Sequence, residues 1–66
     1  MDIRIETSVA GRIRALLLEL ARSQEDMAAE ELAATPYWSS TPTTVLGHRD
    51  AAVALRTAAD GLLAAS

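Results

Sequence analysis

The chain contains no cysteine, no lysine and no phenylalanine, and only two of its 66 residues are aromatic. Without cysteine, disulfide bonds and thiolate metal sites are excluded. A single histidine provides no metal-binding cluster, and no Gly/Asp-rich loop offers a carboxylate site. We therefore expect neither a metal nor a cofactor.

Long hydrophobic runs are also missing, since no stretch reaches the roughly 18 apolar residues that a transmembrane helix needs. The opening residues, MDIRIETS, show no basic region followed by an apolar core, so we expect no secretion signal and a cytoplasmic protein. A formal net charge of −3 provides no electrostatic attraction to nucleic acid or anionic lipid.

The short length limits stability. One small domain, residues 1–66, hides only about 60% of the surface of its unfolded chain and is marginal unless something supports it. Disulfides and metals are excluded above, so a second subunit is the support that is left. The sequence therefore predicts a homo-oligomer.

Residues 2–6, DIRIE, alternate between charged and apolar side chains, which predicts a short half-buried β-strand. A lone strand leaves its backbone donors unpaired, so this one would pair with its copy in another subunit. The alternative is the frayed start of a helix.

From Ser8 the apolar residues follow three-four spacing, which predicts an amphipathic helix over about 8–34. The polar stretch SQED resembles a helix start, so a break near Ser23 is the alternative. Apolar residues at 13, 20, 27 and 34 keep one phase across this stretch, and that phase favours a continuous helix.

Proline separates the two helical stretches. Pro36 ends the first, because the residue before a proline is pushed out of helical geometry, and residues 35–41 are a predicted aromatic loop. Thr41 and Pro42 open a second helix over about 42–60, which Gly61 can end as a left-handed cap.

These elements predict an all-α fold, a helical hairpin or three-helix unit that assembles as a homodimeric bundle. The apolar surface of both helices exceeds what one hairpin can bury, which indicates a core shared between subunits. The expected core residues are Ile13, Leu16, Leu17, Leu20, Val45, Leu55 and Leu62.

Catalysis needs a base or nucleophile beside an orienting partner in a sheltered cleft. His48 is the only side chain of a type that exchanges protons near neutral pH, and its helical neighbours one turn away are not acidic. We interpret His48 as half-buried at the helical seam, with its ring N–H donated to a carbonyl, and expect no enzymatic activity.

The segments MAAEELA and STPTTVLGHRDAA resemble the helix-turn-helix of bacterial repressors, a match that covers residues 12–56. The resemblance implies DNA binding by a dimer, with Thr43, Thr44, His48 and Arg49 toward bases and phosphates. The connection is longer than that family's turn and carries an aromatic pair, and five acids lie within residues 19–31. The excess of arginine and alanine also resembles small proteins of high-GC actinobacteria and their phages, which implies no activity.

Tyr37 and Trp38 are the only aromatic residues and lie in the predicted loop. One interpretation is a plug, with Trp38 closing the end of the hairpin against Leu32 and Val45. The other is an interface anchor, because tryptophan and tyrosine dominate binding hot spots. We expect a small interaction module that binds another protein, with helix-turn-helix DNA binding as the alternative.

Overall fold

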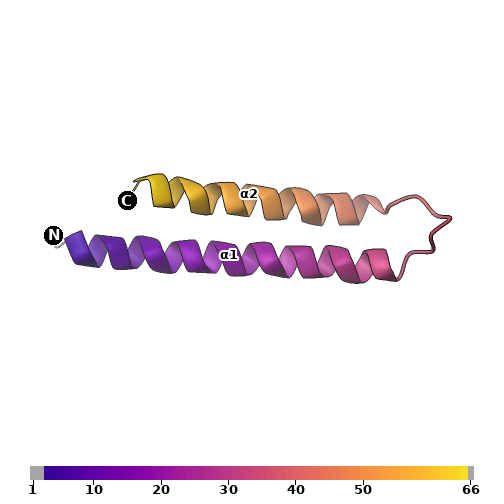
Figure 1. Cartoon of the computed structure of the whole chain (residues 1–66), viewed down its shortest axis with the longest axis horizontal. Helices are drawn as coiled ribbons and strands as arrows, with labels where there is room; N and C mark the ends of the chain where they lie inside the picture. Colours follow the sequence, from indigo (N-terminus) through magenta and orange to yellow (C-terminus); the bar gives the residue numbers. More distant parts are fainter. Residues whose placement is uncertain (1–2, 66) are drawn as a thin grey trace.

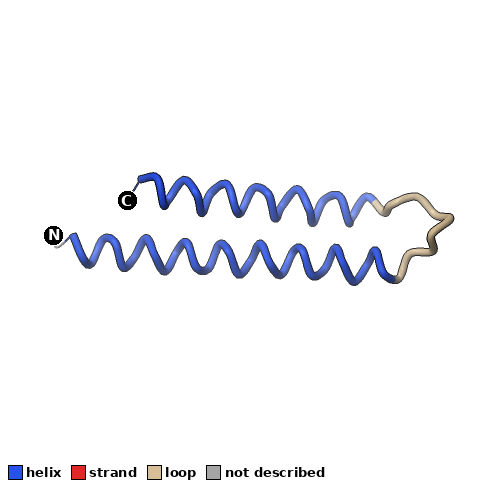
Figure 2. Tube along the Cα trace, in the orientation of Figure 1, coloured by secondary structure: helices blue, strands red, loops and turns tan. Residues whose placement is uncertain are grey.

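The computed structural model describes residues 3–65, and the side chains of residues 9–63. Two helices, α1 (Ile3–Ala33) and α2 (Thr43–Ala65), run antiparallel beside each other and are joined by one loop (Figure 1). Figure 2 shows helix and loop but no strand over this range. The predicted all-α helical hairpin is confirmed, and its three-helix alternative is not what forms.

The strand predicted for residues 2–6 is wrong, because α1 already includes residues 3–6; Asp2 lies outside the described residues. A helix satisfies its own backbone hydrogen bonds, whereas a lone strand needs a partner. For the same reason the first helix begins earlier than the predicted start near residue 8.

Helix α1 continues through Ser23, so the predicted continuous helix is confirmed and the alternative break is wrong. Two of the four polar residues that suggested a break, Gln24 and Glu25, contact α2 from within the helix. Gln24 Oε1 lies 2.6 Å from His48 Nδ1, and Glu25 pairs with Arg56. These contacts use the polar side chains while the backbone remains helical.

Helix α2 begins at Thr43, within one residue of the predicted start. The Pro42 carbonyl accepts backbone hydrogen bonds from Val45 N at 3.1 Å and Leu46 N at 3.4 Å. It does not end near Asp60 but continues to Ala65. No glycine among the described residues has positive φ, so the predicted left-handed cap at Gly61 is wrong. Gly61 lies within the helix instead.

The seam between the helices is built from small residues at seven-residue spacing. The fully buried positions are Ala21, Ala28, Val45, Ala52 and Ala59. Leu17, Leu55 and Leu62 are half-buried beside them. A repeat of seven is typical of coiled-coil packing, and alanine at the contact lets two helix backbones approach closely.

The hairpin is a rod with dimensions of 56 × 15 × 11 Å. Its radius of gyration is 15.8 Å, whereas about 11 Å is expected for a compact domain of this length. Neither helix, over the residues described, is long and apolar enough to cross a membrane.

Candidate functional site

The loop between the helices is held by local hydrogen bonds. At the end of α1, Thr35 donates from Oγ1 to the Glu31 carbonyl at 2.8 Å, which satisfies one of the carbonyls left free at a helix end. Ser39 N then donates to the Pro36 carbonyl at 3.0 Å, which closes a turn. The two residues inside this turn are the aromatic pair.

Tyr37 and Trp38 lie in solvent at the tip of the hairpin, 94% and 75% exposed. Their rings meet edge to face, with centroids 5.0 Å apart and an angle of 85° between planes. An edge-to-face arrangement is favourable for aromatic rings. The exposure of Trp38 does not fit a plug against Leu32 and Val45, so the pair is a preassembled exposed surface.

One flank of the seam, which we call the polar flank, carries two side-chain contacts between the helices. The first is the His48–Gln24 contact given above, and the second is a hydrogen bond from Thr44 Oγ1 to Glu31 Oε1. The half-buried position expected for His48 is confirmed, and the oxygen it meets belongs to a side-chain amide.

These contacts occupy two of the four residues that the helix-turn-helix resemblance places toward DNA, namely Thr44 and His48. The other two, Thr43 and Arg49, are exposed. All four lie in the first two turns of α2, but they do not form one free surface.

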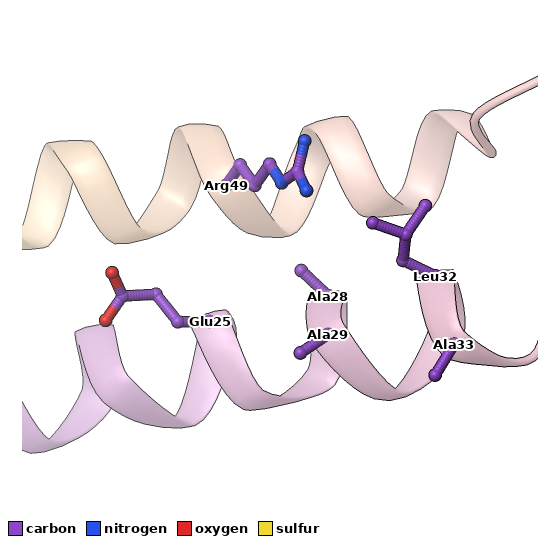
Figure 3. A pocket seen from close by; sticks show the side chains of 6 residues that line it. All are labelled: Glu25, Ala28, Ala29, Leu32, Ala33 and Arg49. Carbon is purple, nitrogen blue, oxygen red and sulfur yellow. The ribbon is translucent and has the colours of Figure 1, made fainter.

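The opposite flank, which we call the arginine flank, holds a shallow groove of about 520 Å³ (Figure 3). In Figure 3, Arg49 of α2 lies above Ala28 of α1, and Leu32 lies further along α1 toward the loop. Further along, Arg56 donates to Glu25; this hydrogen bond, and then the charge of Glu25, raise the pKa of Arg56 above its usual value. Both side chains are about half exposed, so salt screens the pair.

Large apolar side chains also line α1 outside the seam, 44–58% exposed. We call this set the apolar stripe; it comprises Val9, Ile13, Leu16, Leu20 and Met27. Three of the predicted core residues, Ile13, Leu16 and Leu20, therefore lie outside the intrachain seam. Of the others, Val45 is buried in the seam, and Leu17, Leu55 and Leu62 are half-buried there.

The predicted sites omitted Val9 and Met27, which complete the stripe, and the buried alanines, which form the seam. The signal for both was the repeat of seven: the stripe uses 13, 20 and 27, and the seam uses 21 and 28. The predicted core consisted of large apolar side chains, although mostly small side chains form the contact between the two helices.

Among the described residues, no three histidine, aspartate or glutamate side chains gather where they could hold a metal ion. Comparisons with protein families, with curated proteins and with solved structures each found no match to this chain.

Proposed function

We propose that this protein is a non-enzymatic interaction module, which assembles as a homo-oligomer and binds another protein through the tip of its hairpin. The observation that carries the proposal is an inversion of the usual burial of side chains. Among the side chains that the structure describes, the fully buried ones belong to four alanines and one valine, whereas the only tryptophan and tyrosine of the sequence lie in solvent. Exposed apolar surface of this extent is typical of interaction sites.

The tip suits a protein partner because Trp38 and Tyr37 combine large apolar area with polar atoms that can hydrogen-bond. The edge-to-face contact orders both rings before binding, which lowers the entropy lost on association. No charged residue lies between Thr35 and Thr44, so the tip favours an apolar pocket over a charged one.

The test compares Trp38→Ala with the unchanged protein. Because the Trp38 side chain is mostly in solvent, we expect the free energy of unfolding to change by less than about 0.5 kcal/mol. Binding to a protein co-purified from the native host should fall by about tenfold or more, as for a hot-spot residue. Titration calorimetry with the purified partner measures the Kd of both proteins.

The control is Val53→Ala, which shortens another mostly exposed apolar side chain, far from the tip. Undiminished binding by Trp38→Ala would contradict the role of the tip. A large loss of stability in the same variant would instead support the plug.

A second candidate is the DNA binding implied by the helix-turn-helix resemblance. The observation in its favour is that Arg49 is exposed and forms no ion pair among the described residues. Under this hypothesis the protein is retained on heparin at low salt, and Arg49→Ala weakens that retention. An acidic interaction module passes through the column regardless of Arg49.

A further inference from the structure

The apolar stripe is an uncharged surface that its own hairpin does not cover. From Val9 to Met27 its heptad positions hold five large apolar residues and one serine, Ser23. Exposed apolar residues also occur on α2, namely Leu46, Val53 and Leu63, but Arg49, Arg56 and Asp60 interrupt them. The stripe is therefore the longest continuous apolar face among the described side chains.

The exposed area of the chain matches what a dimer would bury. The accessible surface is 5040 Å², whereas a compact monomer of this mass exposes about 4,000 Å². The excess, about 1,000 Å², is close to the roughly 800 Å² that each partner contributes to a stable interface.

We propose that a second copy of this chain docks on the apolar stripe with its own stripe, antiparallel, so that two hairpins form a four-helix bundle. This inference rests on the homo-oligomer of the proposed function and specifies its surface and orientation. On α1, the stripe lies about 100° around the helix from the seam, given about 100° per residue. That angle is close to the angle of about 90° between the two neighbours of a helix in a square four-helix bundle.

The charges beside the stripe favour the antiparallel orientation. In the antiparallel arrangement, Leu16 packs against the partner's Leu20, and Val9 packs against the partner's Met27. In this register Arg12 lies opposite the partner's Asp26, twice by symmetry, whereas Glu19 meets the partner's Glu19 once, at the two-fold axis, so attractive pairs outnumber the repulsive one. Arg12 and Asp26 are both exposed, and neither forms an ion pair among the described residues. A parallel pair would separate Arg12 from the partner's Asp26 by 14 residues, about 21 Å along the axis, and would lose both attractive pairs.

Helix α2 leaves room for a second hairpin on the same flank. The contacts of the polar flank show which side of α2 lies beside the apolar stripe: it is the side that carries Thr44 and the residues that follow it at seven-residue spacing. That side of α2 carries only small residues: Gly47, Ala51, Ala54, Ala58 and Gly61. A Cβ at either glycine would meet open space, so packing inside the hairpin does not require glycine there.

The first experiment is sedimentation equilibrium over a dilution series. We expect the unchanged protein to show twice the 7.0 kDa mass of the chain. The double variant Leu16→Gln/Leu20→Gln should raise the dimer Kd by about a thousandfold or more, because both leucines become buried only in the dimer. The matched control, Leu46→Gln/Val53→Gln, alters equally exposed residues elsewhere and should leave the Kd unchanged.

The second experiment tests the relative orientation of the two copies with variants that leave the leucines of the apolar stripe unchanged. The chain has no cysteine, so single cysteines report proximity directly. Val9→Cys mixed with Met27→Cys should form a disulfide-linked dimer on oxidation. Val9→Cys alone should not, because antiparallel packing separates its two copies by 18 residues, about 27 Å, far beyond disulfide reach.

The outcomes separate this inference from the proposed function. A dimer that keeps its Kd in Leu16→Gln/Leu20→Gln, or that cross-links through Val9→Cys alone, overturns the antiparallel stripe and leaves homo-oligomerisation standing. A chain that stays at 7.0 kDa throughout the series overturns both. Partner binding through Trp38 is measured separately and is affected by none of these results.

Discussion

Arg14 is a polar residue of the seam with a buried side-chain atom that has no partner among the described residues. It lies one heptad before Ala21 and is half-buried, and the atom without a hydrogen-bond partner is its Nε. A buried polar atom without a partner costs about 1–3 kcal/mol. The long apolar stem explains why arginine is tolerated there, since it covers apolar surface while the charge reaches water.

We expect Arg14→Leu to increase the free energy of unfolding by about 1 kcal/mol, because the unpaired atom is removed and the apolar repeat continues. Urea denaturation at a fixed protein concentration measures the change. Arg22→Leu, at an exposed position of the same helix, is the control and should have little effect. A loss of stability in Arg14→Leu would mean that the guanidinium makes a necessary contact.

The two helices illustrate what periodicity alone can and cannot predict. Three-four spacing of apolar residues predicted both helices. Pro36 and Pro42 then located the loop between them, because proline interrupts a helix or begins one. Periodicity could not assign faces, because α1 carries two apolar faces at the same spacing. Leu16 and Leu20 were predicted for a core shared between subunits, whereas the contact within the hairpin is made mainly by alanines, which let α2 approach closely.

Residues 3–6 show a second limit. Over so few positions, alternation of apolar and charged residues cannot be distinguished from the start of a helix. These residues are helical, and a helix needs no partner strand for its backbone hydrogen bonds.

The aromatic tip could be identified as a candidate site because it holds the only tryptophan and tyrosine of the sequence. Its exposure depends on the turn between Pro36 and Ser39, which the sequence indicated only as a loop.

Close approach at the alanine seam has a measurable consequence. Ala52 is almost completely buried, and leucine in its place would force the helices apart. We expect Ala52→Leu to decrease the free energy of unfolding by about 1–3 kcal/mol, as for other overpacked cores. Circular dichroism during urea titration measures this. Ala15→Leu, on the exposed side of α1, should be tolerated, and equal tolerance of both variants would contradict close packing.

At the level of the complete hairpin, stability and assembly are linked. A rod 56 Å long with a core of alanines and one valine buries little apolar area. The proposed dimer would supply the missing burial, and its formation would stabilise the fold by mass action.

The melting temperature of the protein should therefore rise with protein concentration. Scanning calorimetry over a dilution series measures this dependence, and Leu16→Gln/Leu20→Gln should show a low melting temperature that no longer varies. A melting temperature independent of concentration in the unchanged protein would contradict the link.

The aromatic tip lies at one end of the rod, and the first turn of α1 and the last turn of α2 lie toward the other end (Figure 1). If two rods pair antiparallel as proposed, their aromatic tips lie at opposite ends of the bundle. Such a unit would be divalent and would join two target molecules instead of gripping one from both sides. A target that is itself multivalent would then be drawn into a cross-linked network by a protein of only 66 residues.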